Sequence, residues 1–143
     1  LKQDRPDNYM IATGVTTSIR DFVQQSAAHI GLEIAFEGEG EKEKGVLSAI
    51  DDERFVQQVG QPSKAMENRI GQALIHVDPK YFRPTEVELL IGDASKARKQ
   101  LNWTPEYDLE ALIADMMQSD LKLFQKESYL RAGGFDTLNY FES

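Results

Sequence analysis

The chain has 143 residues, with 16 Lys and Arg against 24 Asp and Glu and a formal net charge of −8. This charge excludes an electrostatic binder of nucleic acid or of anionic membranes, because a polyanion would meet a surface of its own sign. The absence of Cys excludes disulfides, thiolate metal sites and a cysteine nucleophile. The length and the 41% hydrophobic content are typical of one globular domain with its own core.

Polar residues open the chain. Residues 1–7 are interpreted as a connector, and because the first residue is Leu1 rather than Met, we expect that sequence upstream has been cut away. No basic-then-apolar leader is present and no apolar run reaches the length of a membrane span. We therefore expect a cytoplasmic location and no membrane partner.

The first predicted elements form a β-α-β unit. An apolar run predicts a strand at residues 8–13, and Ser18 with Asp21 has the spacing of a capping box ahead of an apolar helical stripe. Gly31 ends that helix, and residues 32–36 alternate as a second strand does. If the two strands are parallel neighbours, the crossover between them is right-handed.

A long charged segment separates the second and third predicted strands. Residues 38–72 lack periodicity, so we interpret them as a variable loop with a helical turn or two, of which residues 51–57 are one. Residues 73–77 form the third strand. The alternation of strands and helices predicts an α/β fold, a small domain with short parallel strands.

Two more helices complete the three main helices of this prediction. Asp93 is placed to cap a helix over residues 94–101, which Trp103 and Pro105 follow. Asp108 precedes the final helix, which Gly133 ends. Its apolar residues recur at steps of three and four, and we interpret this stripe as the core-facing side of the helix: Leu109, Leu112, Ile113, Met116, Met117, Leu121 and Phe124.

Catalytic motifs are scarce. No nucleophile elbow or metal-ligand spacing occurs, and His29 and His76 have no neighbour in sequence that marks a general base, so both are interpreted as structural. Residues 38–43 begin like a dinucleotide-binding loop, but Glu43 stands at the third glycine position and no helix pattern follows. The four glutamates at 37, 39, 41 and 43 would also repel a pyrophosphate, so we expect a solvated acidic loop.

The most specific stretch is residues 77–90. Pro84 favours an extended Arg83, whose guanidinium would project from a strand end and match phosphate oxygens with two parallel hydrogen bonds. Glu86 could accept hydrogen bonds from a ribose diol, so the pair suits a nucleotide. The alternative is plain helix-start chemistry from Pro84, Thr85 and Glu86, which leaves Arg83 merely exposed.

Residues 78–86, DPKYFRPTE in one-letter code, resemble the C-terminal signature of GDP-mannose 4,6-dehydratases, members of the extended short-chain dehydrogenase/reductase family. Further segments follow the order and approximate spacing of that family: residues 12–22, 38–40, 43–45, 92–97 and 101–105. The resemblance runs from about Pro6 to the final helix and is weak over residues 47–72.

This resemblance implies that Arg83 contacts the diphosphate of GDP-mannose and that Glu86 contacts its ribose. It also implies that residues 8–143 are the C-terminal, substrate-binding domain of an enzyme that forms a homodimer or homotetramer. In such enzymes a preceding Rossmann domain binds NADP and carries a Tyr-x-x-x-Lys pair. This sequence contains neither that pair nor the glycine-rich cofactor loop. No catalytic, cofactor-binding or metal-binding residue is therefore expected on this chain.

The parent reaction implied by the resemblance converts GDP-mannose into GDP-4-keto-6-deoxymannose. NADP takes a hydride from C4, water is eliminated across C5 and C6, and the hydride returns to C6. We expect the chain alone to be inactive. A second hypothesis is a truncated interaction or structural module with a vestigial nucleotide-sugar site, and a stand-alone hydrolase ranks last because no nucleophile and base pair is found.

Overall fold

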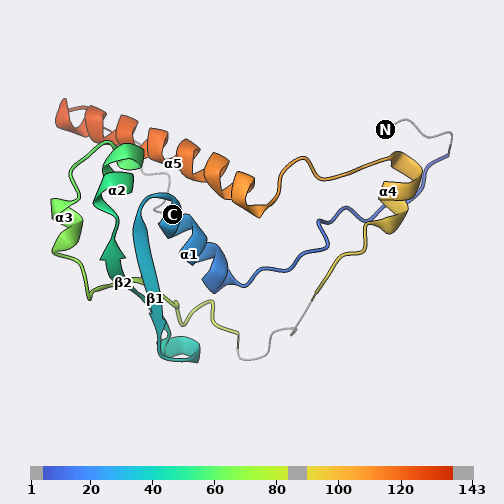
Figure 1. Ribbon diagram of the computed structural model, residues 1–143, viewed down its shortest axis with the longest axis horizontal. Coiled ribbons are helices and arrows are strands. Elements are labelled where there is room, and N and C mark those ends of the chain that lie inside the picture. The colour runs from blue at the N-terminus through green and yellow to red at the C-terminus, as the bar shows by residue number, and fades with distance from the viewer. Residues whose placement is uncertain (1–4, 84–89, 137–143) are drawn as a thin grey trace.

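The computed structural model describes residues 5–83 and 90–136 (Figure 1). Its elements, in chain order, are α1 (Ile19–His29), β1 (Leu32–Glu37), the 3-10 helix η1 (Gly40–Lys42), β2 (Lys44–Ile50), α2 (Asp52–Val59), α3 (Lys64–Glu67), β3 (Ala73–His76), α4 (Ser95–Leu101) and α5 (Leu109–Ala132). The predicted α/β class is confirmed. None of the helices in these two ranges combines the length and apolar character that crossing a bilayer requires.

The three strands form one antiparallel sheet with β2 in the centre. β1 pairs with β2 from Leu32 opposite Ile50 to Glu37 opposite Lys44, and β3 pairs with the other edge of β2. The predicted parallel strands are wrong. The connection from β1 to β2 is a short turn, whereas a parallel pair needs a crossover of a dozen or more residues.

The segment at residues 38–72 is not a loop. It contains the central strand β2 and the helices α2 and α3, so only the predicted short helix at residues 51–57 is confirmed, by α2. β2 follows a run of glutamates and contains Gly45 and Ser48, which weakens its apolar alternation. Three consecutive β2 residues, Gly45 to Leu47, are buried, as expected of a central strand covered on both faces.

Residues 8–13, the predicted first strand, are outside the sheet and run alongside α4 (Figure 1). Three hydrogen bonds join this segment to α4: Tyr9 Oη to Gln100 (3.1 Å), Lys96 Nζ to the Asn8 carbonyl (3.0 Å) and Arg98 to the Thr13 carbonyl (3.1 Å). The predicted β-α-β unit is therefore wrong. An apolar run fits a strand only where a neighbouring edge accepts it, and here the helix takes that place.

The core lies between the sheet and the helices α1 and α2. Leu47 is fully buried at its centre, with Leu32, Ile34 and Phe55 around it. Val23 and Ala27 of α1 pack against this cluster, as does Ile30, the residue that follows the helix. The apolar stripe predicted for the first helix thus faces the core.

Gly31 is the joint between α1 and β1. It has φ of +79°, and a Cβ there would lie 2.7 Å from the carbonyl oxygen of Asp51 and from the backbone nitrogen of Phe55. The backbone nitrogen of Asp51 donates to the Gly31 carbonyl at 2.8 Å. Only glycine satisfies both the backbone angle and the close approach, so the corner after α1 lies directly against the start of α2.

The helix starts follow the predicted capping chemistry. Ser18 Oγ accepts from the backbone nitrogen of Asp21 at 3.0 Å, and Asp108 Oδ1 accepts from that of Ala111 at 2.9 Å. Asp93 Oδ1 accepts from the backbone nitrogen of Ser95 at 2.8 Å, at the first residue of α4. The caps predicted at Ser18 and Asp108 are therefore confirmed, whereas the N-cap residue of α4 is Ala94 and Asp93 lies one residue before it.

The apolar stripe of α5 is mostly not core-facing. Ile113 is the buried residue of this helix, whereas Leu112 and Met116 remain 44% and 45% exposed. The 24 residues of α5 span about 36 Å, while the seven residues of β2 span about 23 Å. The helix packs against α1, whose 11 residues span about 17 Å, so much of its apolar surface has no core to enter.

The buried Leu47 gives the first testable prediction. Leu47→Ala removes three methyl or methylene groups from the centre of the core and should lower the free energy of unfolding by about 3 kcal/mol. Denaturant unfolding measures this loss. The control Val56→Ala, at a side chain 49% exposed on α2, should change it by less than about 1 kcal/mol. Equal effects of the two substitutions would contradict the assigned core.

Candidate functional site

Arg83 lies at the end of the chain segment that follows β3. The backbone nitrogen of Val77 donates to the Glu43 carbonyl at 3.4 Å, so this segment leaves the sheet beside β2. Asp78 then organises a turn: its side chain accepts from the Lys80 nitrogen at 2.9 Å and its carbonyl from the Phe82 nitrogen at 3.1 Å. The turn presents Arg83 to solvent.

The guanidinium of Arg83 is not engaged internally. Within residues 5–83 and 90–136 it makes no ion pair and no hydrogen bond, and its side chain is exposed. An exposed guanidinium without an internal partner keeps all five of its N–H donors available for a phosphate or carboxylate. The other predicted site residue, Glu86, lies outside the described residues, as do Pro84 and Thr85.

The turn before Arg83 contacts the tip of the β1–β2 hairpin. A Cβ added to Gly40 would lie 3.6 Å from the ring of the half-buried Phe82. Gly40 has φ of +59° within η1, and β2 follows this turn directly. The dinucleotide-like residues 38–43 thus form a hairpin tip that contains only the short 3-10 helix η1 and is followed by a strand, and the predicted absence of an α-helix there is confirmed.

The hairpin tip is charged and partly neutralised by its own neighbours. Arg20 at the start of α1 forms an ion pair with Glu43, and Lys44 Nζ lies 3.3 Å from Glu37. The hydrogen bond that Arg20 donates to Glu43, the charge of Glu43 and the nearby charges of Glu39 and Asp21 raise the pKa of Arg20 above its ordinary value. Arg20 is therefore committed to this acidic cluster.

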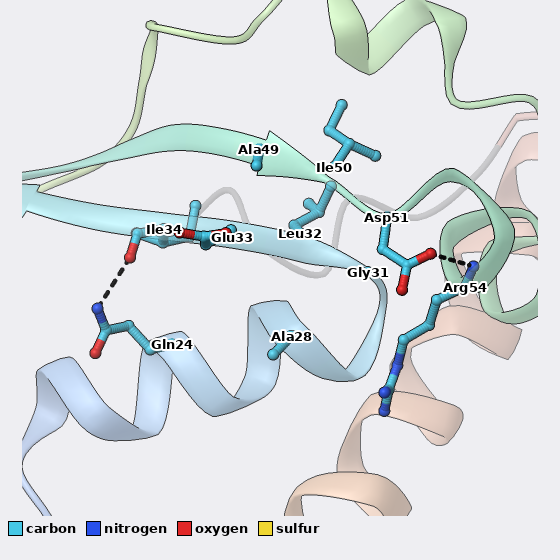
Figure 2. A pocket seen from close by; sticks show the side chains of 10 residues that line it. All are labelled: Gln24, Ala28, Gly31, Leu32, Glu33, Ile34, Ala49, Ile50, Asp51 and Arg54. Atoms are coloured by element: carbon cyan, nitrogen blue, oxygen red, sulfur yellow. Dashed lines mark hydrogen bonds between the residues drawn. The ribbon is translucent and has the colours of Figure 1, made fainter.

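Arg83 lines none of four well-formed hollows in the described part of the chain. The hollow between α1 and the ends of β1 and β2 has a volume of about 580 Å³ (Figure 2). Gln24 donates across it to the Ile34 carbonyl at 2.9 Å, and Asp51 accepts from the Arg54 nitrogen at 3.0 Å. Its polar groups serve the fold and do not converge on an empty space.

The largest of the hollows, about 710 Å³, lies between residues 13–17 and the chain from Pro105 to Leu112. Its lining is mostly apolar and includes Val15, Tyr107 and Leu109. The carboxylate of Asp108 is already occupied by the α5 cap. Such a surface suits apolar packing better than phosphate binding, so we do not assign the nucleotide to it.

Across the described ranges no three His, Asp or Glu side chains gather as metal ligands do. The hairpin tip has four glutamates and lacks the helix N-terminus that binds a pyrophosphate, so it does not suit NADP. The buried Nε2 atom of His29 has no hydrogen-bond partner among the described residues, and this side chain lies on the face of α1 toward α5.

Two carboxylates connect α4 to the start of the chain and to its own first turn. Lys96 Nζ lies 2.7 Å from Asp7, and this hydrogen bond, with a second from the Asn8 backbone, lowers the pKa of Asp7. Hydrogen bonds from Ser95, first from its side chain and then from its backbone, lower the pKa of Asp93. Both groups are fully exposed. The sequence patterns placed Asp93 at the start of this helix but gave no sign of the Asp7 contact, which joins residues 89 positions apart.

Comparison with known proteins identifies relatives over nearly the whole chain. The family model described as "GDP-mannose 4,6 dehydratase" matches residues 1–116. The chain is 41% identical to a "GDP-mannose 4,6-dehydratase" of Vibrio cholerae over 136 residues, which are 95% of this chain and 34% of the relative. It is 42% identical to the "GDP-mannose 4,6 dehydratase" of Drosophila melanogaster, over 88% of this chain and 27% of the relative.

The human "GDP-mannose 4,6 dehydratase" is 36% identical over 87% of this chain. The chain spans about a third of the length of the curated relatives it matches. The comparisons therefore concern one part of a longer enzyme in each relative.

Because the pKa values of Asp7 and Asp93 are lowered, we expect acid to weaken the contact between α4 and residues 7–13 and the hydrogen bonds at the start of α4. A carboxylate whose pKa is lower in the folded chain stabilises it above the unfolded pKa, about 3.9, and this contribution is lost as the pH falls through the folded value. We expect the amide signals of Asn8 and Ser95 to move together below about pH 4 in an NMR titration.

Asp7→Asn should remove the titration seen at Asn8 and leave that at Ser95. Asp120→Asn is the matched control, since Asp120 has no hydrogen bond or ion pair in the described part of the chain. If Asn8 still titrates in Asp7→Asn, the assignment to the Asp7 carboxylate is incorrect.

Proposed function

We propose that this chain, which belongs to the GDP-mannose 4,6-dehydratase family, forms the substrate-binding part of such an enzyme and binds the GDP portion of GDP-mannose. In this proposal Arg83 contacts the diphosphate and Glu86 the ribose. The parent reaction converts GDP-mannose into GDP-4-keto-6-deoxymannose, and NADP supplies the hydride acceptor and donor when bound to another domain. The chain itself contributes affinity and orientation.

The observation that carries the proposal is that the exposed guanidinium of Arg83 has no ion pair or hydrogen bond within residues 5–83 and 90–136. An exposed cation on a chain of net charge −8 has abundant acidic groups to pair with, as Arg20 and Lys96 do. Arg83 makes no such pair within the described residues. A guanidinium left unpaired beside a well-organised turn is suited to an external anion with two oxygens in one plane, as a diphosphate offers.

The sequence supports a proposal in which this chain binds the substrate and another domain carries out the hydride chemistry. None of the five tyrosines has a lysine four residues later, so the Tyr-x-x-x-Lys pair expected for hydride chemistry is missing here. The hairpin tip does not suit NADP either. We therefore place the proton and hydride chemistry on a domain that is not part of this sequence, and the sugar would lie between that domain and the Arg83 turn.

The first test of this proposal is catalytic. The purified 143-residue chain, supplied with GDP-mannose and NADP, should show no loss of water from the nucleotide sugar, measured by mass spectrometry. The Vibrio cholerae relative assayed in parallel is the positive control. Turnover by the chain alone would contradict the proposal that the hydride chemistry lies on another domain. The nucleotide site at Arg83 is tested separately, by binding.

The second test is binding. Titration with GDP should shift the amide signals of Tyr81, Phe82 and Arg83 and those of the hairpin tip at Gly40, and ADP should shift them less. Arg83→Ala removes charge-assisted hydrogen bonds to the diphosphate. It should weaken GDP binding by about 2 kcal/mol, which is roughly thirtyfold in Kd.

Arg69→Ala is the matched control, because Arg69 is also exposed and its side chain has no hydrogen bond or ion pair among the described residues. It should leave the Kd for GDP unchanged. Equal responses to GDP and ADP, or an unaltered Kd in Arg83→Ala, would favour the second hypothesis, a non-catalytic module with a vestigial site.

A further inference from the structure

The tip of the β1–β2 hairpin is a tight turn with little conformational freedom. Gly38 has φ of +83°, and a Cβ there would lie 2.6 Å from the carbonyl oxygen of Lys42, so the turn closes only on a glycine. The backbone nitrogen of Lys42 donates to the Glu39 carbonyl at 3.2 Å. The backbone nitrogen of Glu43 donates to the Gly40 carbonyl at the same distance. The tip is therefore a firm surface for whatever packs on it.

The segment that ends at Arg83 is joined to this tip at two places. The backbone nitrogen of Val77 donates to the Glu43 carbonyl at 3.4 Å. Five residues later, Cζ of the Phe82 ring lies 3.6 Å from the position of a Cβ on Gly40. Figure 1 shows the chain after β3 passing the η1 end of the hairpin. The second contact comes directly before the residue that we assign to the diphosphate.

Exposure alternates along the three residues before Pro84. Tyr81 is 70% exposed, Phe82 is half-buried and Arg83 is exposed. The side chain of Phe82 thus turns toward the hairpin, and that of Arg83 faces solvent. Because the two residues share a planar peptide unit, a ring held in place also restricts the direction in which the guanidinium leaves the chain.

The fold does not explain why Phe82 packs there. Within the described residues it is not one of the half-buried side chains that pack against the core cluster around Leu47. The neighbour of the ring is the hairpin tip, at the end of the sheet away from α2. A contact outside the core, next to the candidate site, points to a role in the site.

We propose that Phe82 is a positioning residue for Arg83: its ring, packed on Gly40 at the hairpin tip, holds the guanidinium where a diphosphate can reach it. This inference rests on the proposed function, in which Arg83 contacts the diphosphate. It adds a role for a side chain that itself contacts no nucleotide.

The physical reason is the conformational entropy of binding. Arg83 makes no ion pair or hydrogen bond within the described residues, so no polar contact orders its side chain there. Its backbone is the part that can be ordered before a ligand arrives. A segment that becomes ordered only on binding lowers affinity, and a segment ordered beforehand avoids this loss. The ring contact therefore matters for nucleotide affinity more than for folding.

The test is a double-mutant cycle on GDP affinity, measured by NMR titration of the full 143-residue chain. Phe82→Ala should weaken GDP binding by about fivefold, since the ligand must then order the backbone at Arg83. Phe82→Ala should have no further effect in the Arg83→Ala variant, because the ring acts through the guanidinium. The heteronuclear NOE of the Arg83 amide should also fall in Phe82→Ala before any ligand is added.

Two further variants separate positioning from a loss of structure. Phe82→Met keeps an apolar side chain of similar reach and should restore most of the affinity. Tyr129→Ala is the matched control, since it removes an aromatic ring that is 81% exposed on α5, and it should leave the Kd unchanged. Circular dichroism and the amide signals of α1 should be the same in all these variants.

The outcomes distinguish this inference from the proposed function. If Phe82→Ala leaves the Kd unaltered, or its effect adds in full to that of Arg83→Ala, the positioning role is overturned and the assignment of Arg83 stands. If the wild-type chain does not bind GDP, or Arg83→Ala binds it equally well, the proposed function fails and the positioning role fails with it. An effect of Phe82→Ala that disappears in the Arg83→Ala variant supports both.

Discussion

The burial of β2 between β1 and β3 is the constraint on which the rest of the structure depends. Leu47, at the centre of β2, is fully buried, and the core cluster around it joins the sheet to α1 and α2. Glu43 directly precedes β2, and its carbonyl accepts a hydrogen bond from the backbone nitrogen of Val77 where the chain leaves the sheet toward Arg83. The position of the candidate site is therefore a consequence of how β2 is paired.

Local structure, such as the start of a helix, could be predicted from the sequence where a few neighbouring residues determine it. Ser18 and Asp108 accept hydrogen bonds from backbone groups three residues ahead, so the helix starts do not depend on anything distant. Strand direction is different. It depends on which segments become neighbours, and β2 was hidden because burial on both faces erases the alternation that marks a half-exposed strand. Without β2, the helix between two strands resembled a parallel crossover.

In the candidate site too, features set by neighbouring residues could be predicted, and contacts between distant segments could not. Arg83 is exposed, as both interpretations of the sequence around Pro84 predict, so its exposure does not distinguish a phosphate contact from plain helix-start chemistry. The packing of Phe82 over Gly40 joins residues far apart in sequence, and no pattern announces such a contact. For α5, the apolar spacing predicted the helix correctly and its environment incorrectly, because periodicity reports that a face is apolar and not what covers it.

Residues 7–13 form no hydrogen-bonded ladder, and side chains of α4 fasten them from the opposite half of the sequence. Residues 7–13 consequently hold in place a helix that lies almost ninety positions downstream. Removing residues 7–13 to make a shorter protein, or fusing a bulky tag next to Asp7, would disturb α4 first. Expression boundaries for this molecule are best placed upstream of Asp7, although the local sequence there looks dispensable.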